Sequence, residues 1–191
     1  ANDWILDTGE ALAIGRRLGE RVLVISTSTG GTLAALMSVQ PDLAQDVIAA
    51  VFISPNFGFG SVAETLLRLP LVRYWGPVFV GAERSFTPAN DLQARYWTTT
   101  YPTTAAIPMA AVVRAAQAQD YTQAVVPALF LYSRDDQVVQ PARTDAVVAA
   151  WGDAMRVIHP DFEDGDDPRR HLITGDVMSP NQTAPTVAAI V

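Results

Sequence analysis

Three residues in this chain have types and positions that could do chemistry together: Ser28, Asp136 and His171. A serine hydroxyl becomes a nucleophile when a histidine accepts its proton and a carboxylate orients that histidine. Ser28 follows the apolar run Val22–Ile25, Asp136 follows the apolar run 127–132, and His171 lies in a polar stretch beyond both. The three side chains therefore predict covalent catalysis at a serine, if the fold brings them together.

The residues around Ser28 predict a tight turn between a buried strand and a helix. Val22–Ile25 is a continuous apolar run, as in the interior of a parallel sheet. Residues 26–31 are all small, and residues 32–36 are compatible with a helix. The spacing small-x-Ser-x-Gly between a strand and a helix is that of a nucleophile elbow, in which a strained turn exposes the hydroxyl above the sheet. A Ser/Thr-rich loop whose serines cap a helix is the alternative.

Each small residue of this turn has an expected role. Ser26 and Gly30 are expected to approach each other closely, which requires small side chains, and Gly31 completes the turn. The amide of Thr29 is expected at the N-terminus of the helix, where it can donate to a developing oxyanion. Ser26 stands where the G-x-S-x-G pattern has its first glycine.

The acid and the base follow Ser28 in the order serine, aspartate, histidine. This order is typical of one superfamily of serine hydrolases and differs from the order in the other folds. On the segments Ser26–Gly31, Asp135–Pro141 and His171, the chain resembles the α/β-hydrolases, most closely bacterial carboxylesterase and monoacylglycerol-lipase-like members.

The resemblance implies that Ser28 is the nucleophile, His171 the general base and Asp136 the acid. Asp136 directly precedes an x-Val-Val-x-Pro segment, as the acid of the resembled pattern does, and Asp135 is its nearest competitor. The second histidine, His159, is expected at the end of a strand. The resemblance implies no cofactor and no metal, and its substrate would be a small-molecule ester.

The resemblance also implies an α/β fold, with a mostly parallel sheet covered by helices on both faces. Further strands are expected at 47–54, 127–132 and 155–159, and helices at 1–19, from about 141 to 151 and from about 183. Residues 1–191 are expected to form one partial catalytic domain. Within it, the aromatic and proline-rich span 56–120 would be an inserted lid, which favours an apolar acyl or alkyl group in the substrate.

The chain begins with Ala1, and the strand before Ser28 is the first that the pattern predicts. In the resembled fold several strands precede this one, together with the loop that supplies a second oxyanion donor. We therefore expect this sequence to be the C-terminal portion of a longer hydrolase. The strand at 22–25 would then be covered by an absent N-terminal segment or by a second copy of the chain.

Composition excludes several classes of function. With 49% hydrophobic and 17% charged residues the chain is globular, and without cysteine it has no disulfide, thiol nucleophile or cysteine metal site. A formal net charge of -7 argues against a nucleic-acid partner, which would need a basic face. No apolar run predicts a membrane span and no signal peptide is visible, so a cytoplasmic location is expected.

Three alternatives remain from the residues alone. A non-catalytic α/β-hydrolase-like binding module would keep the fold without turnover. A dinucleotide-binding enzyme would use the turn 58–63, which fits G-x-G-x-x-A although Pro55, Asn56 and Phe57 separate it from the preceding strand. The acidic stretch 161–167 could hold a cation, but it is better interpreted as a solvated acidic loop that positions His171.

Overall fold

The computed structural model of the protein describes residues 1–67 and 69–191. Its main sheet is parallel and, over the described residues, has four strands in the order β1-β2-β5-β6. These strands are β1 (Val22–Thr27), β2 (Val47–Ile53), β5 (Ala128–Leu131) and β6 (Met155–Ile158). The predicted parallel sheet is confirmed, and each predicted strand is present with its ends shifted by no more than two residues.

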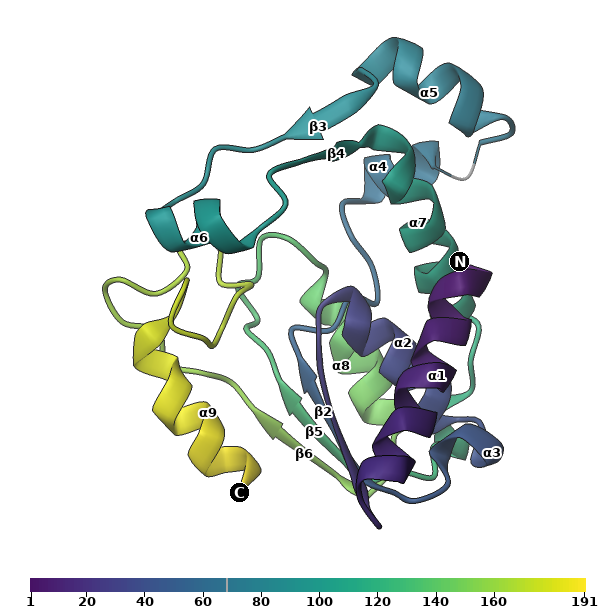
Figure 1. Ribbon diagram of the computed structural model, residues 1–191, viewed down its shortest axis with the longest axis vertical. Helices are drawn as coiled ribbons and strands as arrows, with labels where there is room; N and C mark the ends of the chain where they lie inside the picture. The colour runs from purple at the N-terminus through teal and green to yellow at the C-terminus, as the bar shows by residue number, and fades with distance from the viewer. Residues whose placement is uncertain (68) are drawn as a thin grey trace.

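Helices cover both faces of this sheet (Figure 1). One face carries α1 (Asn2–Leu18), α2 (Thr29–Ser38), α3 (Pro41–Ala44), α7 (Ala106–Gln117) and α8 (Pro141–Ala150). The other face carries α9 (Thr183–Ile190). Short 3₁₀ turns, η1 (Thr103–Ala105), η2 (Tyr121–Gln123) and η3 (Pro180–Gln182), precede α7, β5 and α9.

The alternation of side chains along β2 divides the core between the two faces. Phe52 points toward the larger helical layer, where its ring stacks on that of Phe130 with centroids 4.6 Å apart. Trp151, at the end of α8, packs edge-on against both rings at 5.2 and 5.3 Å. The smaller cluster on the other face is formed by Val51, Ile53, Leu131 and Ile173.

Strand β1 pairs with β2 alone among the described residues. Val22 and Val24 pack against the larger core cluster, whereas Leu23 and Ile25, on the other face, are 41% and 56% exposed. The expectation that an absent segment or a second copy covers this strand stays a prediction.

The chain between β2 and β5 forms a cap above the end of the sheet at which Ser28 follows β1 (Figure 1). The cap consists of α4 (Ser61–Leu66), α5 (Val72–Val80), the antiparallel pair β3 (Glu83–Ser85) and β4 (Thr100–Pro102), and α6 (Asp91–Tyr96). Helix α7 then returns to pack on α2, so the last part of the span 56–120 belongs to the helical layer. No helix in residues 1–67 and 69–191 is both long and apolar enough to span a bilayer.

Candidate active site

Ser28 lies in a strained turn between β1 and α2. Its φ of 51° and ψ of -119° put a non-glycine residue in a rarely occupied backbone region. The turn is held by the end of β2, because the Ser28 amide donates to the Ile53 carbonyl (2.9 Å) and the Asn56 amide donates to the Ser28 carbonyl (3.0 Å). Thr29 is the first residue of α2, so its amide lies at the helix N-terminus beside the serine.

The steric constraint of the turn lies at Gly31. A Cβ added there would be 2.8 Å from Pro55 Cβ and 3.1 Å from Pro55 Cα, so no side chain fits without a backbone shift. The prediction that Gly30 is crowded against Ser26 is wrong, since a Cβ on Gly30 would meet nothing within 4 Å. Ser26 is buried for a different reason: its hydroxyl donates to the Val51 carbonyl across the sheet (2.8 Å).

Ser28, His171 and Asp136 form one hydrogen-bonded series. His171 Nδ1 lies 2.7 Å from Asp136 Oδ2, and His171 Nε2 lies 3.1 Å from Ser28 Oγ. Because a carboxylate only accepts, Nδ1 carries the proton and donates to Asp136, which leaves Nε2 to accept from the Ser28 hydroxyl. This tautomer is the one that a general base requires.

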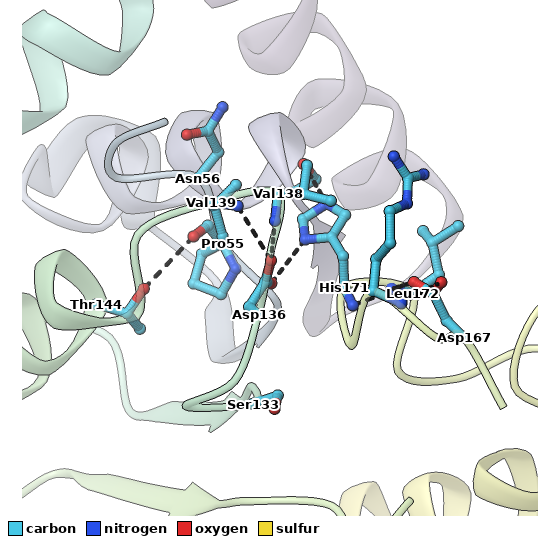
Figure 2. A network of polar contacts seen from close by, with 12 residues as sticks. Pro55, Asn56, Ser133, Asp136, Val138, Val139, Thr144, Asp167, His171 and Leu172 are labelled. Carbon is cyan, nitrogen blue, oxygen red and sulfur yellow. Dashed lines mark hydrogen bonds and ion pairs between the residues drawn. The ribbon is translucent and has the colours of Figure 1, made fainter. Parts of the chain in front are cut away.

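The Asp136 carboxylate is fixed from a second side (Figure 2). Its Oδ1 accepts from the backbone amides of Val138 (2.7 Å) and Val139 (3.0 Å) while Oδ2 faces His171. The Asp136 side chain is 1% exposed and that of His171 is 8% exposed. The pair therefore interacts in an environment that bulk water hardly reaches.

The two competing residues lie outside this series. Asp135 is exposed, and its backbone amide donates to Ser133 Oγ. His159 follows β6, as expected, and its Nδ1 donates to the carbonyl of Tyr132, whose ring it also meets edge-on. Within the described part of the chain, neither residue forms a hydrogen bond to Ser28 or His171.

The acidic stretch differs from the expected solvated loop. Asp166 and Asp167 are 7% and 1% exposed, so the expectation of solvation is wrong for these two residues. The pair Asp167-Pro168 is typical of the first half of a type I turn, so the sequence predicts a turn here but not the burial of either carboxylate. Over the described residues, no group of three or more His, Asp or Glu side chains is arranged to hold a metal ion.

The glycine-rich turn lies against α8. A Cβ on Gly58 would be 3.1 Å from Arg143 Cγ and 3.2 Å from Gln140 Oε1, and Phe59 forms an isolated bridge with Val139. A dinucleotide turn instead needs its first glycine at the strand end, whereas β2 ends at Ile53. The side chains of Ser61 and Ala63, which complete this motif, lie outside the described residues.

A hollow of about 310 Å³ lies in the cap, between α4, α5, η1 and α7. Most of its walls are apolar, from residues such as Leu66, Val72, Trp75 and Ile107, and among the described residues of its lining only Arg84 is charged.

A family model described as "Alpha/beta hydrolase family" matches residues 2–174. Three solved structures are similar to this chain. One is a metagenome-derived lipolytic enzyme of the LipS and LipT pair, with 17% identity and a TM-score of 0.63. The others are a monoacylglycerol lipase from Paleococcus ferrophilus (15% identity, TM-score 0.60) and a monoglyceride lipase from Saccharomyces cerevisiae (9% identity, TM-score 0.64). The matches cover 84%, 82% and 99% of this chain but 63%, 65% and 66% of those chains. The chain thus spans less than two thirds of their length, and at these identities the likeness shows the fold. A search of curated protein sequences found no match to this chain.

Proposed function

The chain belongs to the α/β-hydrolase family, and from that premise we propose that it is a serine hydrolase that cleaves carboxylic esters. The observation that carries the proposal is the hydrogen-bonded series from Ser28 Oγ through the His171 ring to the Asp136 carboxylate, at 3.1 and 2.7 Å. Nucleophile, base and orienting acid are within reach of one another in the tautomer that proton transfer needs.

The proposed reaction proceeds in two halves. His171 Nε2 takes the Ser28 proton as Oγ bonds to the ester carbonyl carbon, and the carbonyl oxygen becomes an oxyanion facing the Thr29 amide. The tetrahedral intermediate collapses, the ester C–O bond breaks, and His171 gives the proton to the departing alcohol. Water then attacks the acyl carbon as it loses a proton to His171. The bond between Ser28 Oγ and the acyl carbon breaks, His171 returns the proton to Oγ, and the carboxylic acid leaves.

Asp136 acts in this scheme by stabilising the positive imidazolium that forms twice per turnover. Its carboxylate can do so without reorganising, because Val138 and Val139 already hold Oδ1. A charge fixed in advance in a buried site stabilises the transition state more than a charge that must first turn into place.

The proposed substrate is a small ester with an apolar acyl or alkyl group. The cap, which makes up most of the span 56–120, would act as the lid, and the hollow between α4, α5, η1 and α7 offers apolar walls that such a chain would contact. The names of the similar solved structures, a lipolytic enzyme and two monoacylglycerol lipases, support the same substrate class.

The test is labelling of the protein with a fluorophosphonate, read by peptide mass spectrometry. We expect an adduct on Ser28 in the wild-type chain and in Ser26→Ala, which removes the neighbouring small serine. We expect none in Ser28→Ala, and labelling at least about a hundredfold slower in His171→Ala, since general-base assistance is worth 10²–10⁴. Labelling of Ser28 no faster than that of other serines would contradict the proposal and favour a non-catalytic binding module.

A further inference from the structure

The backbone of His171 is held by a second buried carboxylate, that of Asp167. Asp167 Oδ2 accepts from the amides of His171 (3.1 Å) and Leu172 (2.8 Å), and Oδ1 accepts from the amide of Arg169 (3.1 Å). Figure 2 shows this carboxylate beside the backbone of His171 and Leu172, on the side away from Asp136. The histidine is therefore fixed at its ring by one aspartate and at its main chain by another.

The loop between these two contacts is closed on itself. The Arg170 amide donates to the Asp167 carbonyl (2.9 Å), which makes Asp167-Pro168-Arg169-Arg170 a β-turn, and Arg170 then takes a left-handed φ of 59°. Ser179, which is fully buried, completes the loop: its hydroxyl accepts from the Asp167 amide and donates to the Leu172 carbonyl.

The same loop is joined to the loop that carries the acid. The amide of Gln137, the residue after Asp136, donates to the Arg169 carbonyl (2.9 Å). Since Asp167 Oδ1 accepts from the Arg169 amide, the carboxylate holds the residue through which the two loops meet. Any loosening of the Asp167 turn would thus move His171 relative to Asp136.

The partners of Asp167 are unusual for a buried charge. Among residues 1–67 and 69–191, no cationic group lies within ion-pairing distance of its side chain, and the ion pairs are Arg16–Asp46 and His171–Asp136. Burying a carboxylate is costly unless hydrogen bonds compensate it, and here three backbone amides do so. All three donors belong to the segment that carries His171.

We propose that Asp167 is a positioning residue for His171: its carboxylate fixes the main chain at His171 so that Nε2 faces Ser28 while Nδ1 faces Asp136. The expected effect on reaction rate rests on the proposed function. The position of the His171 ring can be measured without substrate and does not depend on that function. Small misplacement of a catalytic base costs large factors in rate, so the expected effect is on kcat and not on substrate binding.

Two neighbouring substitutions form a matched pair. Asp167→Asn keeps the shape but replaces one acceptor oxygen by an NH₂ group, which must face a backbone N–H and repel it. Asp166→Asn alters a residue of the same type and similar burial whose Oδ2 accepts from Glu163 and Gln182 and not from the His171 segment. We expect kcat for an activated ester to fall by about 30- to 100-fold in Asp167→Asn with KM within about twofold, and both constants to stay within about threefold in Asp166→Asn.

A proton NMR measurement separates positioning from general loss of structure and needs no turnover. The hydrogen-bonded Nδ1–H of His171 should give a far-downfield resonance, assigned by its absence from His171→Gln. We expect this resonance to be lost or shifted in Asp167→Asn and retained in Asp166→Asn. If the wild-type chain shows the resonance but hydrolyses no ester, the proposed function fails and the positioning proposal is still decided by the pair of spectra.

The proposal is overturned if Asp167→Asn keeps both the resonance and kcat, or if the two variants lose them equally. Should Asp167→Asn fail to fold, Ser179→Ala decides the question, because it removes the hydroxyl that ties Asp167 to Leu172 and leaves the carboxylate in place. A fall in kcat with the resonance shifted supports positioning, and a folded Ser179→Ala variant with unchanged kcat and resonance contradicts it.

Discussion

The exchange of Asp136 for asparagine tests the tautomer argument on which the proposed mechanism depends. Asparagine has the same shape, and its oxygen can still accept from Val138 and Val139. Its NH₂ group would then face His171 Nδ1, where the carboxylate oxygen lies 2.7 Å away in the native protein. A donor there favours the tautomer with the proton on Nε2, and that nitrogen can no longer accept the Ser28 proton.

The size of the effect follows from which interaction is lost. A base held in the wrong tautomer costs about 10³- to 10⁴-fold in kcat, which corresponds to about 4 to 5.5 kcal/mol of transition-state stabilisation. The folded state loses much less, because the backbone contacts of the side chain survive: a hydrogen bond to a charged group is worth about 1.5 to 3 kcal/mol, and a weaker contact replaces it. A large loss of activity with a modest loss of stability is the expected signature.

Asp135→Asn is the matched control, because Asp135 is the adjacent aspartate and is exposed. The assay is kcat and KM for a 4-nitrophenyl ester, with urea unfolding of each variant measured alongside. We expect Asp135→Asn to keep wild-type kcat within about twofold, as surface substitutions usually do. The reasoning is refuted if Asp136→Asn keeps kcat within about tenfold of wild type, or if Asp135→Asn shows the larger loss.

Three further predictions concern stability and are measured by urea unfolding. Gly31→Ala should destabilise the fold by about 1–3 kcal/mol, because its Cβ would overlap Pro55. Gly30→Ala lies in open space on a helix and should be neutral or stabilising by up to about 1 kcal/mol. Equal effects of the two substitutions would contradict this reasoning. Burial raises the pKa of Tyr121, so the contribution of its neutral hydroxyl to stability is fully present below the unfolded-state pKa of about 10 and is lost as pH rises toward the folded-state pKa. The free energy of unfolding of the wild type should therefore fall more between pH 8 and 11 than that of Tyr121→Phe. Phe130→Ala should cost about 3–5 kcal/mol through the cavity left beside its stacked neighbour, and a loss below about 1 kcal/mol would show that the core collapses into the space.

The fold could be predicted where burial imposes a pattern on the sequence. Val22–Ile25, 47–54 and 127–132 are short apolar runs because strands of a parallel sheet with helices on both faces carry apolar side chains on both sides, and these runs contain strands β1, β2 and β5. The sequence predicted the residue range of the cap but not its helices, because α5 has apolar residues at exposed as well as at buried positions. Val78 and Phe79, for example, are 80% and 79% exposed. Without a burial pattern, composition indicates where the cap lies but not how its helices are arranged.

Some residues of the candidate site could likewise be predicted from the sequence, and others could not. Ser28 and Asp136 could be predicted because each would act through its own side chain and each follows the end of a strand, where the apolar run before it limits the choice of residues. Asp167 acts through hydrogen bonds to backbone amides, and every residue except proline has such an amide. Its partners therefore leave no trace in residue type, and the acidic neighbours at 161–166 make it look like one more solvated charge. Burial alone distinguishes it, since a carboxylate that is 1% exposed must have its hydrogen bonds satisfied locally, and in this loop the donors belong to the histidine's own segment.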